Sequence, residues 1–502
     1  MKRLTLAALC SLALSAASWA ASVAAPVAAT PQASPGAVGQ NPQRLKLPNG
    51  LELYVYRDSA VPLARIQLVF RAGAISQGSD NAGLFHLYEH LVFGQGSSRG
   101  GADGIKAELA RMGATDWSGG TQAERIGYSL AMPSSRFAEG MALFAELATA
   151  PLDVDADRLE AEKETVAREI RELAADPDAL YEAAMTRRLF AKYPWRRDPA
   201  GSEKAVRAAT IESLRALQAT WFVPNNAALF VGGDVDPQAA REAAERLFGA
   251  WKAGPDPWAK PLPPNPRPGV TRPTWIVFPD PSLPEGIGSV EARYRGPDLG
   301  PGAGADPASS YGADLWTALR AAPDGRFKSE LMKNVPKLYG ANSISATYAS
   351  QRDGGWLSLS AYFLVDPALP AVDRARAFKE RSRGYEMTSM KTDPSYFSAA
   401  DYEAARKRLL DGRALALDSV SGALDALSFW WATASVDYFL GYPDAIAKCG
   451  PKELASFLDV YVMRNLEVVA LRMNPSDYEK EKRSFAGSGF ENWEHLAWAG
   501  AL

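Results

Sequence analysis

The chain has 502 residues, with 55 Lys and Arg against 58 Asp and Glu, and a formal net charge of -3. Its hydrophobic fraction of 47% and charged fraction of 23% are typical of soluble globular proteins of two or three domains. The balanced charge, without a long basic block, argues against nucleic-acid binding. Two cysteines exclude a disulfide framework.

The N-terminus has the pattern of an export signal. Two basic residues precede an apolar run over 4–17, which is too short for a convincing membrane span, and 18–20 has a small-x-small cleavage pattern. We therefore predict a signal peptide at 1–20, a periplasmic or secreted protein, and no membrane span after cleavage. Cys449 would then be the one remaining thiol, and we expect it to be a buried small apolar side chain.

A first half is predicted after a lead-in over 21–42, which is rich in Ala, Pro, Ser and Gln and is expected to be disordered. Hydrophobic periodicity then predicts strands at 51–57, 63–70, 126–132 and 227–231. It predicts helices at 84–93, 103–112, 135–149, 155–175, 178–191 and 237–251. These elements define an expected domain over 43–251. Eight prolines in 252–273 predict a semi-rigid linker after it.

A second half is predicted over 274–502, with a similar order of elements. Its expected strands are 275–278, 289–294, 344–349, 356–363 and 466–473. Its expected helices are 309–321, 326–334, 373–390, 399–417 and 420–438. The repeated order, at an offset of roughly 220–240 residues, suggests a structural duplication. We expect an α+β fold of two similar halves, each an antiparallel-rich sheet flanked by helices.

Two of the three histidines fall in one pentad, His86-Leu87-Tyr88-Glu89-His90. On a helix, positions i and i+4 share a face, so both imidazoles can reach one metal ion, while Glu89 lies near enough to face a water. Neutral imidazole is a good zinc ligand, and a catalytic zinc site keeps one position open. The alternative is a core helix whose histidines bond to their neighbours. The apolar flanks favour a metal, because histidines and a carboxylate buried together need a partner.

An acidic helix over 159–172 is the best source of a third ligand. Glu162 and Glu169 are seven residues apart, about two turns, and so share a face with Val166. Taken alone, this stretch is typical of a solvated charged face. The stretch becomes a candidate source of a metal ligand because the histidine pair needs a third ligand.

The pentad and the later Glu162, Val166 and Glu169 together resemble the pitrilysin/insulinase zinc peptidases, most closely their bacterial mitochondrial-processing-peptidase-like branch. Four shorter stretches also resemble this family, at 47–51, 71–74, 82–84 and 221–226. The resemblance implies a clamshell of two halves in which His86, His90 and Glu169 bind one Zn²⁺ per chain. It also implies that Glu89 is the general base and that Glu162 orients a ligand or the water.

The chain departs from the family pattern at two places. The family supplies an Arg and a Tyr, seven residues apart, that hold substrate and oxyanion. Tyr339 fits the Tyr position as a catalytic residue, and the alternative is a half-buried strand residue. Met332 stands where the Arg is expected. In the substrate-binding edge strand, the usual Asn is replaced within a segment containing Trp117 and Ser118. We expect these two residues to contact substrate, although Trp117 could equally only pack.

The sequence therefore predicts a zinc metalloendopeptidase that acts on peptides or unfolded segments. The missing Arg suggests a zinc-bearing subunit that works as a homodimer, or as a heterodimer with a related chain supplying an Arg/Tyr pair. The alternative is a non-catalytic chamber or assembly subunit. The intact set of metal-ligand residues favours the enzyme.

Overall fold

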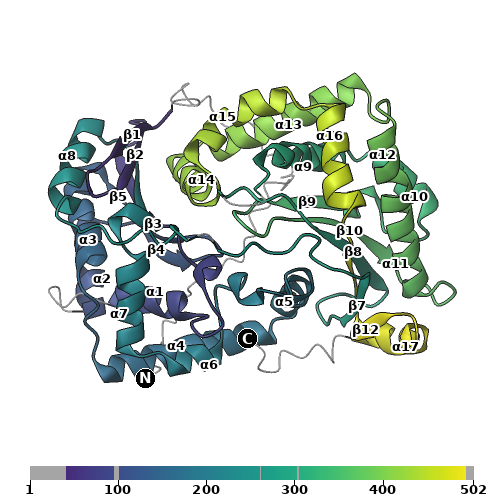
Figure 1. The fold of residues 1–502 in the computed structure, drawn as a ribbon, viewed down its shortest axis with the longest axis horizontal. Coiled ribbons are helices and arrows are strands. Elements are labelled where there is room, and N and C mark those ends of the chain that lie inside the picture. The colour runs from purple at the N-terminus through teal and green to yellow at the C-terminus, as the bar shows by residue number, and fades with distance from the viewer. Residues whose placement is uncertain (1–40, 95–100, 261, 302–304, 493–502) are drawn as a thin grey trace, which may run out of the picture.

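The computed structural model describes residues 41–94, 101–260, 262–301 and 305–492. The expected signal peptide and nearly all of the expected lead-in lie outside these residues. Figure 1 shows two α+β halves side by side, the first from purple to teal and the second from green to yellow. Each half is built on one six-stranded sheet.

The first sheet has the strand order β1-β2-β6-β3-β5-β4. The β2–β6 pair is parallel, and every other pair in it is antiparallel. Among the residues that the structure describes, the edge strand β4 therefore has a sheet partner on one side alone. The strands are β1 (Gln43–Lys46), β2 (Glu52–Arg57), β3 (Leu63–Phe70), β4 (Asp116–Thr121), β5 (Ile126–Pro133) and β6 (Ala227–Gly233).

The second sheet has the order β12-β7-β11-β8-β10-β9, and it repeats the topology of the first except at its outer strand β12, which pairs parallel to β7. The β7–β11 pair is parallel, whereas β11–β8, β8–β10 and β10–β9 are antiparallel, as in the first sheet. The expected duplication is thus confirmed in the connectivity of the strands. The strands are β7 (Thr274–Pro279), β8 (Ile287–Arg295), β9 (Ser345–Ala349), β10 (Trp356–Leu364), β11 (Val468–Met473) and β12 (Phe490–Asn492).

Helices cover both sheets. The first half contributes α1 (Leu84–Gly94), α2 (Gly101–Met112), α3 (Phe137–Thr149), α4 (Ala156–Ala175), α5 (Pro177–Leu189), α6 (Glu203–Ala208), α7 (Ile211–Trp221) and α8 (Pro237–Phe248). The second half contributes α9 (Pro307–Leu319), α10 (Arg326–Asn334), α11 (Ala371–Lys379), α12 (Thr388–Thr392), α13 (Ala399–Ala416), α14 (Val420–Thr433), α15 (Val436–Ala447), α16 (Pro451–Leu458) and α17 (Pro475–Phe485). The fold is the expected α+β pair of similar halves.

Each half lends one helix to the sheet of the other half. Helix α14 packs on β6, β3 and β2, where Trp431 is 1% exposed and its ring centroid lies 6.0 Å from that of Phe230. Helix α5 packs on β8 and β11, where Glu182 accepts two hydrogen bonds of 2.8 and 2.9 Å from Arg293. Separating the halves would expose both of these buried faces.

The segment over 252–273 is held by both halves. Among its described residues, it contains no helix or strand. Trp258 Nε1 donates to Asn226 Oδ1 in the first half at 3.0 Å, and Asn265 Nδ2 donates to Asp353 in the second half at 3.0 Å. These contacts suit a semi-rigid connection, while the exact domain bounds remain a prediction.

Two predicted helices differ from the structure. The helix expected over 420–438 breaks at Ala434, and Ser435 starts α15 by accepting a hydrogen bond from the Tyr438 N–H. The helix expected over 373–390 is π-helical over Glu380–Met387, between α11 and α12. Ser has a side chain suited to a helix N-cap, which explains the first break.

Cys449 is 5% exposed, as expected, and its Sγ lies 3.5 Å from the Ala445 carbonyl oxygen. Burial raises the pKa of its thiol to about 11, so the reactive thiolate is disfavoured. No helix in the described part of the chain combines the length and the apolar character needed to cross a membrane.

Candidate metal centre

The loops around the start of α1 fix where this helix begins. The Gly83 N–H donates to Gln77 Oε1 at 2.6 Å, and Gln77 Nε2 donates to the carbonyl oxygens of Trp195 and Asp198 at 2.8 and 3.0 Å. Gly83 has a φ of +97°, and a Cβ there would lie 2.9 Å from the Ala200 carbonyl oxygen. Glycine is required at this position by both its conformation and the close approach.

Helix α1 is anchored in the first-half core, and its two histidines share one face. Leu87 and Leu91 are completely buried, and His86 is 5% exposed. The ring centroids of His86 and His90 are 4.8 Å apart. The i, i+4 spacing of the sequence therefore brings the two imidazoles together, as predicted.

Helix α4 brings the acidic residues to the histidines. The helix starts at Asp155, whose side chain accepts the Arg158 N–H at 2.8 Å. Val166, which is completely buried, packs α4 into the same core as α1. Glu162 and Glu169 lie one turn before and one turn after Val166, so both carboxylates face the histidines.

The three predicted ligands bring their donor atoms close together. Glu169 Oε2 lies 3.4 Å from Nε2 of His86 and 3.4 Å from Nε2 of His90, and the two Nε2 atoms are 3.2 Å apart. Ligands about 2.0–2.1 Å from a tetrahedral zinc ion are separated by roughly 3.3–3.4 Å. The donor set and its spacing therefore fit one zinc ion with an open fourth position. Among the described residues, this is the one cluster of three such side chains.

The polar atoms at this cluster also indicate a cation. Within the described part of the chain, Glu169 Oε2 and His86 Nδ1 are buried without a hydrogen-bond partner. Burial lowers the pKa of His90, but the carboxylates of Glu162 and Glu169 outweigh burial and raise this pKa to about 10. Burial raises the pKa of Glu169, and the two histidines outweigh it and hold this pKa well below its usual range. The site favours positive charge, which a metal ion would supply.

Glu89 is bonded to the edge strand β4. It is 5% exposed, and its Oε2 accepts a hydrogen bond of 2.7 Å from Thr121 Oγ1, at the end of β4. Its position in the pentad still places it beside both histidines. Thr121 thus holds one oxygen of Glu89, an interaction that sequence reasoning missed.

The two predicted substrate residues lie on opposite faces of β4. Trp117 packs on the helical side, with its ring centroid 5.9 Å from that of Phe144. The Ser118 Oγ lies 2.9 Å from the Ser129 Oγ on the other side. Trp117 therefore has the packing contact that was one of its two expected roles, and substrate contact by either residue remains a prediction.

Tyr339 belongs to the second half, whereas the three metal donors belong to the first. Its side chain is 60% exposed, and its N–H donates to the Tyr362 carbonyl oxygen at 2.9 Å. Met332 packs against the second-half core and supplies no polar group at the position of the family Arg. The structure does not bring Tyr339 into the donor cluster, and its catalytic role stays a prediction.

Comparison with known families matches both halves of the chain. The insulinase (peptidase family M16) model matches residues 54–200, and the peptidase M16 inactive-domain model matches residues 208–388. The first match contains the candidate metal-site residues His86, Glu89, His90, Glu162 and Glu169. Together the two matches cover more than half of the chain.

Two curated relatives and one solved structure show the same similarity. Coenzyme PQQ synthesis protein F of Pseudomonas aeruginosa is 30% identical over 43% of this chain and 28% of the relative. Probable zinc protease PqqL of Escherichia coli is 27% identical over 39% of this chain and 22% of the relative. The chain thus aligns with less than a third of the length of these two relatives.

The crystal structure of the first half of the periplasmic protease PqqL from Escherichia coli has a TM-score of 0.70 and 17% identity to this chain. The match covers 90% of this chain and 96% of that one, and it shows a common fold. Family models, relatives and fold agree, and the chain belongs to the insulinase-type M16 peptidase family.

Proposed function

We propose that this chain is a zinc metalloendopeptidase that hydrolyses peptide bonds in peptides or unfolded segments. The observation that carries the proposal is the spacing of 3.2–3.4 Å among the Nε2 atoms of His86 and His90 and the Oε2 atom of Glu169. The name of the E. coli relative, probable zinc protease, supports this chemistry.

His86, His90 and Glu169 would hold one zinc ion. Bound there, zinc would supply a Lewis acid that polarises a peptide carbonyl and makes water more acidic. Glu162 Oε2 lies 3.4 Å from Nδ1 of His90 and would accept a hydrogen bond from it, which keeps Nε2 deprotonated and directed at the ligand site. Two neutral imidazoles and one carboxylate leave a divalent site with a net positive charge.

Glu89 is the proposed general base. Thr121 occupies its Oε2, which leaves Oε1 to accept a proton from the attacking water and to deliver it to the leaving amine. The free edge of β4 can bind an extended chain as an additional strand, with Ser118 and Trp117 nearest to that substrate. Such a binding mode requires an unfolded or extended segment as substrate.

Tyr339 and a related chain complete the proposal. A tetrahedral intermediate carries a negative oxygen, and Tyr339 would supply one hydrogen bond to it, but Met332 supplies none. We propose that a related chain, in a heterodimer, supplies an Arg/Tyr pair, whereas a homodimer of this chain would have to work without that Arg. The match to the first half of PqqL supports this idea, because that half is one of the two parts of a longer protease.

The proposed location is the periplasm. The export pattern at the N-terminus supports it, and the solved E. coli relative is described as a periplasmic protease. A non-catalytic chamber or assembly subunit is the competing function. The complete set of ligand, base and base-holding residues favours the peptidase.

The experiment combines metal analysis with cleavage of a quenched fluorescent peptide library. The purified protein is expected to hold one zinc per chain, to cleave unfolded peptides, and to lose activity in chelator and regain it with zinc. Absence of stoichiometric zinc, or a zinc-loaded protein that cleaves nothing with any partner unit, would support the non-catalytic function.

A further inference from the structure

The turn that follows the edge strand β4 is clamped from the first half. The Gln122 N–H donates to the Arg125 carbonyl oxygen at 2.9 Å and closes the turn. The N–H groups of Ala74 and Ile75 donate to the carbonyl oxygens of Gln122 and Ala123 at 3.1 and 2.7 Å. This turn is therefore a rigid piece that begins directly after Thr121.

Glu124, in the middle of this turn, reaches into the second half. It is 6% exposed, its Oε2 accepts the Arg352 N–H at 2.8 Å, and its Oε1 accepts the Asp353 N–H at 3.3 Å. The carboxylate thus bridges the two halves through two main-chain groups, 228 and 229 residues away. A buried carboxylate needs such donors, and here they come from the other half.

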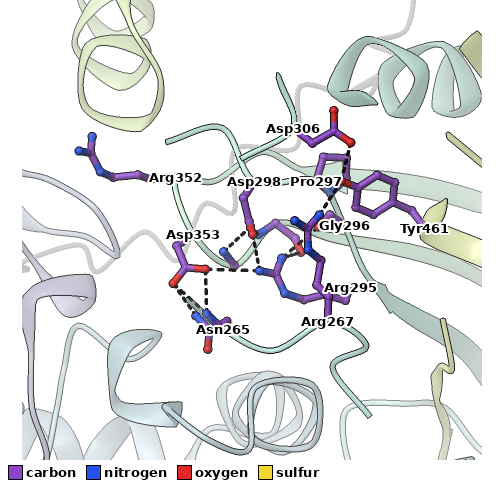
Figure 2. Close-up of polar contacts among 12 residues, drawn as sticks. Asn265, Arg267, Arg295, Gly296, Pro297, Asp298, Asp306, Arg352, Asp353 and Tyr461 are labelled. Carbon is purple, nitrogen blue, oxygen red and sulfur yellow. Dashed lines mark hydrogen bonds and ion pairs between the residues drawn. The ribbon is translucent and has the colours of Figure 1, made fainter. Parts of the chain in front are cut away.

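The receiving turn, between β9 and β10, is fixed by the second half and by the linker over 252–273 (Figure 2). Asp298 Oδ1 accepts the Gly354 N–H at 2.7 Å, and Asp298 Oδ2 is bonded to Arg295 at 2.7 Å. Asn265 donates its N–H and its Nδ2 to the Asp353 carboxylate at 3.2 and 3.0 Å. The turn that carries the two main-chain donors for Glu124 therefore has further contacts of its own.

A first-half arginine holds the same turn from the other side. Arg197 Nη1 donates to the Asp353 carbonyl oxygen at 2.7 Å. Gly354 has a φ of +118°, and a Cβ there would lie 2.3 Å from Arg197 Nη1, so the guanidinium fits closely against the turn. The contact between the halves at this point is tight on both faces.

We propose that Glu124 is a positioning residue for the base. By bonding to the β9–β10 turn of the second half, Glu124 holds Thr121, three residues earlier, and Thr121 in turn holds Glu89 through its 2.7 Å hydrogen bond. The second half would then help to orient the base. This inference rests on the proposed peptidase function.

Glu124→Gln is the main test. The amide keeps the shape, but it presents one donor where the main chain also presents donors, so the bridge weakens. A base displaced by about 1 Å can lose on the order of 100-fold in rate. We expect kcat to fall roughly 10- to 100-fold, with KM changed far less and zinc content unchanged. Asn265→Ala, which loosens the receiving turn from the linker, should lower kcat in the same direction by a smaller factor.

Glu182→Gln is the matched control. Glu182 also bridges the halves, through Arg293, but it lies on α5 and away from β4. The Glu182→Gln substitution should lower stability and leave kcat unchanged.

Thr121→Val should reproduce the kcat loss of Glu124→Gln, and Thr121→Ser should keep the activity. Adding Glu124→Gln to a Glu89→Gln background should cause no further loss of kcat. A further loss in that background, or a kcat loss in Glu182→Gln equal to that in Glu124→Gln, would overturn the proposal.

Hydrogen exchange separates this inference from the proposed function. Amide exchange in the segment 116–126 should become faster in Glu124→Gln and stay at the wild-type rate in Glu182→Gln. If the wild-type protein cleaves no peptide, the proposed function fails, and the exchange data still decide whether Glu124 holds this strand. Unchanged exchange in Glu124→Gln would refute the coupling even in an active peptidase.

Discussion

Glu162 Oε2 lies 3.4 Å from Nδ1 of His90, on the side of the imidazole opposite to the Nε2 atom that faces Glu169. One ring therefore meets two carboxylates with different tasks. Glu169, on the Nε2 side, is placed to bind the same metal ion as His90. Glu162, on the Nδ1 side, is placed to orient the imidazole of His90. This asymmetry separates two glutamates that the sequence places on one helical face.

Glu169→Gln should therefore lower zinc affinity much more than Glu162→Gln. Loss of a residue that orients a ligand typically costs about 10- to 100-fold in metal affinity, and loss of a ligand costs more. Competition with a zinc chelator indicator measures both constants. Equal affinities in the two variants would contradict the assignment, and Glu164→Gln, on the same helix and half exposed, is the control that should bind zinc as the wild type does.

Glu89→Gln should keep the zinc and lose most of the peptidase activity. General-base catalysis typically contributes about 100- to 10,000-fold, and the amide cannot accept the proton. His90→Ala should lose both zinc and activity, since it removes a ligand. Metal analysis and initial rates on the same preparations test the pair, and a Glu89→Gln protein that cleaves at the wild-type rate would show that another group is the base.

Local pattern placed the candidate metal-site residues on their helices, and the family resemblance assigned Glu169 as the third ligand, but neither predicted the surroundings of the site. The spacing of His86, Glu89 and His90, and the two turns between Glu162 and Glu169, are properties of single helices, so the sequence could place them. Hydrophobic periodicity did not predict strand β4, because its Gly119-Gly120 pair and Asp116 are depleted in strands, and only the family resemblance implied an edge strand there. It forms because β5 pairs with it along its whole length.

Contacts between the halves could not be predicted either. Glu124 is an isolated acidic residue in a turn. Nothing near it in the sequence indicates that its hydrogen-bond donors lie more than 220 residues away. The sequence predicted a helix over 420–438, but not that α14 would cover the sheet of the other half. Such pairings depend on how two folded halves meet, which hydrophobic periodicity does not encode.

Trp431→Ala should destabilise the whole protein. The side chain is 1% exposed and packs on β6, and the Arg71 guanidinium lies over its ring, 3.8 Å from the centroid. Replacing a buried Trp by Ala typically costs about 3–5 kcal/mol. Urea unfolding monitored by far-UV circular dichroism should show this loss. Leu415→Ala, at a side chain that is 76% exposed on α13, should change stability by less than about 0.5 kcal/mol.

Stability should fall as the pH rises toward neutrality because of two buried carboxyl groups. Burial raises the pKa of Glu124 to about 7 from 4.5, and burial raises the pKa of Asp314 to about 7 from 3.8. A raised pKa in the folded state means that the folded protein binds more protons between these values. The stabilisation is present below the unfolded pKa and is lost as the pH rises through about 7.

Glu124→Gln and Asp314→Asn should each flatten this dependence. The free energy of unfolding, measured at pH 5 and pH 7.5, should drop with pH more steeply in the wild type than in either variant. Glu285→Gln, at a side chain that is 65% exposed, should keep the wild-type slope. A wild-type slope in both buried variants would show that neither group titrates in this range in the folded protein.

The last prediction concerns the second unit. A zinc ion bound at the site would offset part of the negative charge that develops on the carbonyl oxygen, and removing one further donor typically costs about 100- to 1000-fold in rate. Tyr339 supplies one hydrogen bond, and Met332 is packed against the second-half core, so no cation of this chain stands at the expected Arg position. Lys333, the next residue, points about 100° away around the helix.

The chain alone should therefore cleave peptides slowly, and addition of a related chain carrying the Arg/Tyr pair should raise kcat without changing zinc content. Titration of one chain with the other, followed by initial rates and metal analysis, measures this directly. Full activity of the lone chain that is unaffected by Tyr339→Phe would exclude both the partner and the role of this tyrosine.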